Sequence, residues 1–470
     1  MRWTLKLIGV VSTIVLARLL VPDDFGVVAQ AYIVIALAST FMDLGVDLAL
    51  IQNRNATAGY YDTAWTMRIA QATCISIAVF LAAPFAAAYF HDSRAIPVIR
   101  ALSIGIVLGS LENIWVVTFQ KELKFELDFK FAFLKRMVLF VLTVSLAVAW
   151  RSYWALVVGQ VAGTVVGVLI SYRMHEGRPH LSISHIRELF SFSWWALWRA
   201  IGNYFVGELH RLFVGGRAPT ETMGAYSVAN SIAGMPTGEL LAPLYRALFP
   251  TFVQTRDQPS ELKRIYLLAQ GLQAMLLIPI GVGMVLTASE IVLLLLGSKW
   301  TPAIPFLQIL AFCELGNAFL NGSGYILLTL DKIRRSVAIA WSQVVALVIG
   351  VLILFPDAGA LQIAWLRVAS VACGVLVAIW MVRGVLPGLR NRDVAANAYR
   401  PILASVLMAI TLYMLADVVR LPVLPMFLIK VIVGAVVYVL AMVVLWRLSG
   451  RPVGAETYII DKIGSFWSSR

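Results

Sequence analysis

Apolar runs of about 20 residues follow one another along almost the whole chain, and they constrain its fold more than any other feature. A run of this length crosses a bilayer as an α-helix, whereas the strands of a membrane β-barrel alternate over about 10 residues. Only 13% of the 470 residues are charged, against about 25% in soluble domains. The sequence therefore predicts an all-α polytopic membrane protein and excludes a soluble enzyme.

Short polar segments such as HDSRAIP, GGRAPTET and FPDAGA separate the apolar runs. We predict fourteen transmembrane helices from this pattern, and a further short apolar helix at 289–296 in the outer interface. The fourteen predicted ranges are 3–20, 25–51, 62–90, 97–119, 128–149, 152–174, 189–214, 222–249, 264–288, 302–329, 335–355, 358–382, 401–418 and 424–446.

The first apolar run begins with basic residues, as a signal peptide does, but it lacks a small-residue cleavage site. We interpret it as an uncleaved first helix. Basic residues favour the cytoplasmic side of a membrane, and with the N-terminus inside most of the 38 fall in inside segments. The sequence therefore predicts that both termini are cytoplasmic, and the net charge of +13 reflects topology rather than nucleic-acid binding. The outside loops would hold Arg18, Arg94, Arg100, Arg151, Arg217, Lys299 and Arg420.

No motif for a cofactor, a metal or a catalytic group stands out. There is no GxxxxGK[ST] phosphate-binding loop, and the three cysteines lie inside apolar runs without CxxC spacing. His175, His180 and His185 follow a five-residue spacing that matches no common metal pattern. Because every loop is too short for a catalytic domain, we predict neither an enzyme nor a cofactor.

An internal repeat relates VPDDFGVVAQA at 21–31 to APTETMGAYSVAN at 218–230, about 198 positions later. Transporter folds are commonly built from such repeats. We predict an N-terminal six-helix lobe at 1–175, a C-terminal six-helix lobe at 187–383, two additional helices at 400–447 and a cytoplasmic tail at 448–470. The same offset leaves the first helix short, so we expect a start codon upstream of Met1.

Several segments, in order along the chain, resemble the oligosaccharide flippase family, the polysaccharide-transporter branch of the multidrug/oligosaccharidyl-lipid/polysaccharide exporter superfamily. The resemblance runs from about residue 8 to residue 450. It is carried by STIVLARLLVPDDFGVVA (12–29), DLGVDLALIQ (43–52), FQKELKFE (119–126), NYFVGELHRLFVGG (203–216), LYRALFPTF (244–252) and LLLGSKWTPAIPFLQIL (294–310).

This resemblance implies two lobes around a central cavity in a bacterial inner membrane. It also implies a polyprenyl-diphosphate-linked oligosaccharide as cargo, flipped from the inner to the outer leaflet by alternating access for O-antigen, capsule or exopolysaccharide export. A polysaccharide polymerase and chain-length machinery are the implied protein partners. His210 departs from the family pattern, which often has Asp or Asn at that position.

Charged residues inside the helices are the candidate site, because an unpaired charge in a membrane is costly and ionisable groups there are usually functional. Arg199, Glu239 and Asp43 each lie about 13–15 Å from the inner end of their helices. We predict that Arg199, Arg246, Asn203 and His210 bind substrate, since arginine suits a diphosphate. Asp43, Glu239 and Asp47 would balance charge or couple to an ion, and Arg18, Asp23 and Asp24 would form an outer cap and gate.

Simpler roles remain open for several of these residues. Arg199 and Glu239 could be a structural ion pair, and Arg246 could extend to the inner surface. In the second lobe Glu314, Asn317 and Asn321 form one polar stripe, either for packing, for a lipid-tail groove or for substrate.

Two other functions compete with the flippase. A cation-coupled drug exporter would share the architecture, but it would favour carboxylates over the two arginines. A membrane-embedded glycosyltransferase or polymerase could use Asp23 and Asp24 as its acidic pair, but such enzymes usually need a large outer loop, and none is present. The sequence leaves energy coupling open between an ion gradient, the membrane potential and downhill flow.

Overall fold

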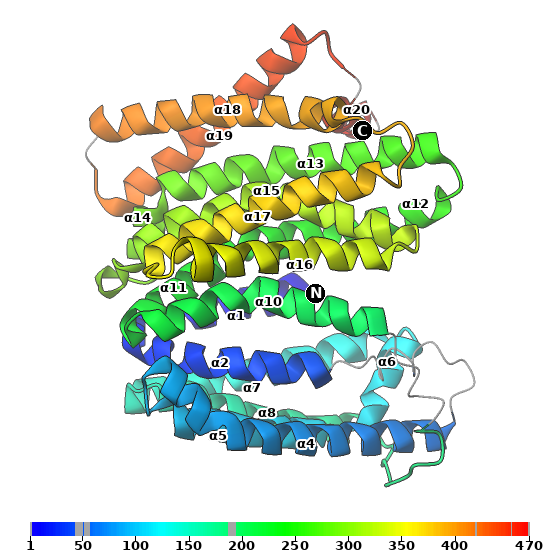
Figure 1. Cartoon of the computed structure of the whole chain (residues 1–470), viewed down its shortest axis with the longest axis vertical. Helices are drawn as coiled ribbons and strands as arrows, with labels where there is room; N and C mark the ends of the chain where they lie inside the picture. Colours follow the sequence, from blue (N-terminus) through cyan, green and yellow to red (C-terminus); the bar gives the residue numbers. More distant parts are fainter. Residues whose placement is uncertain are drawn as a thin grey trace. The chain divides into compact units, whose positions relative to one another are not determined.

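A computed structural model describes residues 2–42, 50, 57–186, 194–418, 421–452 and 454–468, and the regular elements of these residues are all helices. The chain, drawn in Figure 1, divides into two compact units. Unit 1 consists of Met1–Tyr204 and Arg211–Ser227, and unit 2 of Phe205–His210 and Val228–Arg470.

The helices from the N-terminus to residue 233 belong wholly or mainly to unit 1. Their bounds are α1 Arg2–Leu19, α2 Pro22–Met42, α4 Ala58–Phe90, α5 Ala95–Ser110, η1 Ile114–Val116, α6 Val117–Lys121, α7 Phe125–Trp150, α8 Trp154–Met174, α10 Trp194–Arg217 and α11 Thr220–Ala233.

The remaining helices belong to unit 2. Their bounds are η2 Thr237–Leu241, α12 Ala242–Gln254, α13 Pro259–Leu286, α14 Ala288–Leu295, η3 Ser298–Trp300, α15 Ala303–Thr329, α16 Ile333–Ile349, η4 Gly350–Leu354, α17 Ala360–Arg383, α18 Asn391–Val418, α19 Val423–Leu448 and α20 Ala455–Ser468.

Ten helices of the described chain are long and apolar enough to cross a membrane, and eleven if the bent pair at 95–121 is one span. This makes the chain a multi-pass membrane protein, as the sequence predicts. Each of the fourteen expected ranges also contains a helix, and the further short helix expected at 289–296 is α14. The number of spans above ten or eleven stays a prediction.

Several helices differ from the sequence expectation. The expected helix 222–249 is divided into α11, η2 and α12. The range 97–119 breaks by 67° between α5 and η1, where Asn113 accepts a hydrogen bond from the Trp115 N–H at 3.1 Å and so starts a new helix. Helix α18 begins at Asn391, ten positions before the expected 401, because Asp393 accepts a hydrogen bond from the Arg390 N–H. The expected tail contains α20, which Glu456 ties to Arg400 of α18 at 3.2 Å.

The two segments of the internal repeat meet inside unit 1. A Cβ on Gly26 would lie 1.9 Å from the Thr220 carbonyl oxygen, and a Cβ on Gly224 would lie 1.8 Å from the Pro22 carbonyl oxygen. The relation is reciprocal, since Pro22 and Gly26 correspond to Thr220 and Gly224 at the repeat offset. Only glycine lets two backbones approach this closely.

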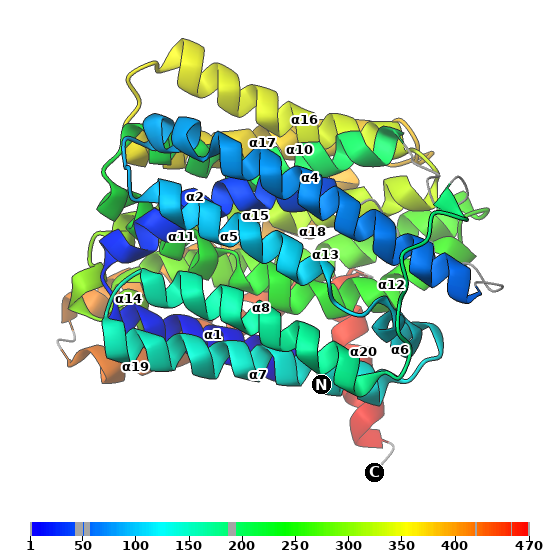
Figure 2. The same ribbon diagram turned by 90° about the horizontal axis from the view of Figure 1, so that it is seen from below.

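Unit 1 packs small residues between long helices. Helices α2, α4, α5 and α8 share a buried cluster that includes Val27, Ala83, Ile99 and Val157. On another side α7 lies along both α1 and α8 (Figure 2). Gly159 of α8 contacts Thr143 of α7 closely, which lets these two helices pack along their length.

Unit 2 is built around α15, which packs between α13 and α17 (Figure 1). Tyr266 and Ile326 are fully buried in the cluster that these helices share. The Gln270 amide donates to the Tyr266 hydroxyl at 3.0 Å, and the Tyr266 and Ser323 hydroxyls lie 3.2 Å apart. Helix α18 packs on the opposite side of α13 and carries α19. Helices α13, α18 and α19 together line a groove in unit 2.

Candidate functional site

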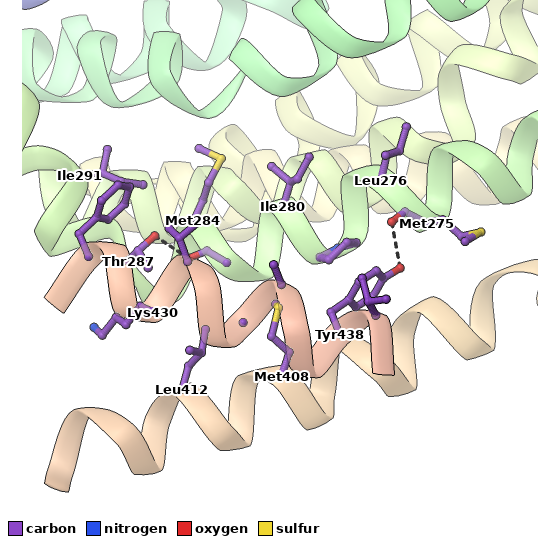
Figure 3. Close-up of a pocket in the computed structure, with 17 residues that line it drawn as sticks. Met275, Leu276, Ile280, Met284, Thr287, Ile291, Met408, Leu412, Lys430 and Tyr438 are labelled. Carbon is purple, nitrogen blue, oxygen red and sulfur yellow. Dashed lines mark hydrogen bonds between the residues drawn. The ribbon is translucent and has the colours of Figure 1, made fainter. Parts of the chain in front are cut away.

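An apolar groove of about 440 Å³ runs between α13 and α19 in unit 2, with α14 and α18 completing its walls (Figure 3). Its lining is almost entirely aliphatic side chains and methionines, which adapt to irregular apolar shapes. The residues that line it most prominently in Figure 3 are Met275, Leu276, Ile280, Met284, Ile291, Met408 and Leu412.

The polar groups of the groove are satisfied within the protein. The Tyr438 hydroxyl donates to the Met275 carbonyl at 2.9 Å, and the Thr287 hydroxyl donates to the Gly283 carbonyl at 2.7 Å (Figure 3). Lys430 Nζ lies 2.5 Å from Glu290 Oε1 and also donates to a backbone carbonyl of α13. With its polar atoms engaged in this way, the groove suits a hydrocarbon chain rather than a sugar.

Lys430 and Glu290 join α19 to α14, and both side chains are buried. The sequence places Lys430 inside a helix but gives it no partner. A buried ion pair persists only when its geometry and hydrogen bonds offset the cost of desolvation. Here Ser289 supplies a further hydrogen bond to the carboxylate at 2.8 Å.

The predicted substrate-binding residues of α10 differ in exposure. Arg199 is half-buried and Asn203 is exposed, whereas His210 is only 1% exposed. Asn203 is thus open to solvent or lipid, and the His210 ring is enclosed by protein. Their assignment to the substrate stays a prediction.

The other membrane charges predicted for the site lie outside the described part of the chain. This holds for Asp43 and Asp47, and for the side chains of Glu239 and Arg246, whose backbones belong to η2 and α12. The pairing of Arg199 with Glu239 therefore also stays a prediction.

The predicted gate residues Asp23 and Asp24 start α2, where carboxylates favour the helix dipole. Asp23 accepts two hydrogen bonds from Arg94, at 2.6 and 2.9 Å, a partner that the sequence did not suggest. Asp24 accepts the Tyr153 backbone N–H at 3.0 Å. Arg18 is exposed on α1. A gating role for these residues stays a prediction.

Arg94 also binds Asp92, which ties the turn between α4 and α5 to α2. Burial disfavours the ionised form of Asp92, but hydrogen bonds from Arg94 and from Thr220 outweigh this effect and hold its pKa below the ordinary value. The two carboxylates in turn raise the pKa of Arg94. Arg94, Asp92 and Asp23 form a charged clamp at this turn.

The polar stripe predicted on α15 has the expected geometry. The Asn317 amide donates to Glu314 at 3.1 Å, and the Asn321 amide donates to the Asn317 carbonyl at 2.9 Å. The stripe also binds Thr237 of η2, whose hydroxyl donates to the Glu314 carboxylate. The sequence analysis missed Thr237, although Pro236 and Gly238 beside it signal a break in the helix.

The fold places the chain in a recognisable class of membrane protein. Superposition on the lipid II flippase MurJ in an inward closed conformation gives a TM-score of 0.76, with 12% identity, over 95% of this chain and 98% of that one. An inward-facing multidrug resistance MATE family transporter of the MOP superfamily gives 0.59, with 14% identity, over 84% and 95%. The chain thus has the helical fold shared by these proteins.

Residues 15–305, more than half of the chain, match the polysaccharide biosynthesis protein family, and the chain belongs to that family. The lipopolysaccharide biosynthesis protein WzxC of Escherichia coli K12 is 24% identical over 70% of this chain and 68% of its own length. The succinoglycan biosynthesis transport protein ExoT of Rhizobium meliloti is 24% identical over 65% and 62%. The teichuronic acid biosynthesis protein TuaB of Bacillus subtilis is 22% identical over 67% and 65%. The chain thus spans about two thirds of these relatives.

Proposed function

We propose that this protein is a flippase that moves a polyprenyl-diphosphate-linked oligosaccharide from the inner to the outer leaflet for polysaccharide export. The observation that carries the proposal is the match to the polysaccharide biosynthesis family on a fold that superposes on MurJ along almost its whole length. A transport protein of succinoglycan biosynthesis among its relatives supports the same function.

The groove between α13 and α19 supports a lipid-linked cargo rather than a soluble one. Its apolar walls offer a path for a polyprenyl chain, while a drug of ordinary size would need polar groups placed to orient it. In this proposal the tail lies in the groove, and arginine side chains elsewhere, Arg199 first, hold the diphosphate. Asn203 and His210 on the same helix, and Arg246, complete the proposed substrate set.

The finer architecture belongs to the same proposal. Fourteen spans would form two six-helix lobes and two additional helices, with both termini in the cytoplasm. Asp43, Asp47 and Glu239 would balance the arginines between cargoes, and Arg18, Asp23 and Asp24 would close the outer side.

The test of the function is depletion of the protein in cells that carry it. We expect the lipid-linked repeat unit to accumulate on the inner leaflet while polymer export stops, and re-expression of the full chain to restore both. Arrival of the repeat unit at the outer leaflet at the normal rate would reject the flippase. Loss of drug resistance without such accumulation would favour an exporter instead.

Arg199→Ala tests the proposed diphosphate contact. A charge-assisted hydrogen bond is worth about 1.5–3 kcal/mol, so we expect export to fall by about tenfold to a hundredfold with the protein still folded. Arg217→Ala is the matched control, because Arg217 ends the same helix and is exposed. Export that is equal in the two variants would remove Arg199 from the site.

A further inference from the structure

A buried carboxylate, Glu314, lies in the middle of α15 and has no role in the groove or in the proposed diphosphate contact. It is 2% exposed. Its carboxylate accepts hydrogen bonds from the Thr237 hydroxyl and from the Asn317 amide at 3.1 Å, and the Thr237 backbone N–H interacts with it as well. Three uncharged donors from two helices thus surround one acid.

Within the described residues, no lysine or arginine forms an ion pair with Glu314. An ionised carboxylate that is buried in a membrane protein without a cation is costly, and binding a proton removes that cost. Glu290 provides the contrast, because this glutamate is also buried but is paired with Lys430. The other buried acids of the described chain, Asp92 and Glu456, are likewise paired, with Arg94 and Arg400. Among the buried acids described, Glu314 is therefore the one suited to exchange a proton.

The backbone beside Glu314 is irregular and open. Thr237 begins the π-helix η2, directly after Pro236, which lacks the N–H that a regular helix needs. π-Helical turns frequently occur at functional sites. Gly238 is exposed, and a Cβ added to it would meet no atom within 4 Å. The half-buried Thr237 therefore connects the buried acid to open space through which a proton can arrive.

Other charged and titratable groups lie on the helices around α15. Cys313, the neighbour of Glu314 on α15, is buried, and α17 carries Arg367. The residue of α13 beside Glu314 is Gly281, which carries no titratable group. The side chains of Glu239 and Arg246 lie outside the described part. The other groups and their partners are Tyr266 with Ser323, Glu290 with Lys430, and Arg335 with the Met381 carbonyl.

We propose that Glu314 is the proton-coupling residue of this transporter. After cargo has been carried outward, the carboxylate takes up one proton from the outer side, and the same proton leaves toward the cytoplasm once the transporter has returned to its inward-facing state. No bond of the cargo changes, and the residue returns to its ionised form. This inference rests on the proposed flippase function and supplies the energy source that the sequence leaves open.

Infrared difference spectroscopy of the full chain in lipid nanodiscs tests the proton itself. Spectra recorded at acidic and alkaline pH should show a protonated carboxyl band in the wild type that is absent from Glu314→Gln. Glu290→Gln is the matched control and should keep the band. A band that survives in Glu314→Gln, or one that responds to sodium and not to pH, would overturn the proposal.

Transport in cells tests the coupling. Collapsing the proton gradient while holding the membrane potential should lower the steady-state ratio of outer-leaflet to inner-leaflet repeat unit by about tenfold per pH unit removed, for one proton per cycle. Glu314→Gln should be slow with or without the gradient. Wild-type rate and wild-type gradient sensitivity in Glu314→Gln would reject the proton role while leaving the flippase intact. Unchanged transport on depletion of the whole protein would reject the flippase instead.

Thr237 gives a second test that does not depend on changing the acid. Thr237→Val removes the hydroxyl at nearly constant volume, and Thr237→Ser keeps it. Loss of this hydrogen bond should move the midpoint of the carboxyl titration by about one pH unit in Thr237→Val only. Identical midpoints in both variants and the wild type would contradict the proposed site.

Discussion

Lys430→Met should destabilise the protein, because it removes one partner of the buried ion pair with Glu290. The change leaves Glu290 buried without its cation, whose Nζ lies 2.5 Å from the carboxylate. Removing one partner of a buried pair costs about 3–5 kcal/mol. Because the hydrogen bond from Ser289 survives, we expect a loss near the lower end of that range, about 3 kcal/mol.

Replacing both partners separates the charge from the packing. In Lys430→Met combined with Glu290→Met no buried charge remains, so stability should return to the wild-type value or exceed it by about 1–4 kcal/mol. Thermal unfolding of the full chain in detergent is the assay. For a domain of about 200 residues a loss of 3 kcal/mol lowers Tm by roughly 6–12 °C.

Lys263→Met is the matched control for this experiment. Lys263 pairs with Asp393 at 2.6 Å, but both side chains are more than a quarter exposed, so the pair is worth about 1 kcal/mol or less. If Lys430→Met is no less stable than Lys263→Met, or if the double replacement is no more stable than Lys430→Met, the reasoning about the buried pair is refuted.

Two further changes test the groove and the charged clamp. Gly283→Leu should fill the groove and reduce export. It should not lower stability, because Gly283 has no atom near its Cβ position and leucine favours a helix by about 1 kcal/mol over glycine. The control is Gly324→Leu, which is equally uncrowded but lies outside the groove and should export normally. Arg94→Gln should cost about 1 kcal/mol, because Arg94 is 40% exposed. The pKa of Asp92 is lowered in the folded protein, so its contribution is present above about pH 4 and is lost as the pH falls through the folded pKa. The Tm difference between Arg94→Gln and wild type should therefore shrink in acid, and a constant difference would contradict the assignment.

Local pattern was enough to predict most of the helices. Helix ends follow proline, glycine and aspartate segments, and the apolar runs between them are long, so the ranges agree with the structure to within a few residues at most ends. The extension of α18 to Asn391 was missed because basic residues there were interpreted as a loop. Helix α20 was missed because it is short and amphipathic, although Glu456 at its start is anchored by Arg400.

Side-chain contacts between segments that are far apart in the sequence could not be predicted. Glu290 and Lys430 are 140 positions apart, and Thr237 and Glu314 are 77 apart, so no local spacing relates them. Sequence reasoning identified Glu314 as part of a stripe, because that stripe lies on one helix. It could not find Thr237 without knowing that η2 packs beside α15.

The reciprocal contact of Gly26 with Thr220 and of Gly224 with Pro22 has a consequence for how the protein can change through evolution. Similar segments that lie far apart in a fold can diverge independently. Here the two similar helix starts touch each other, so a larger side chain in either one collides with the backbone of the other. Both segments are thus held to glycine at the same position, and these two helix starts should be among the last places where the segments lose their likeness.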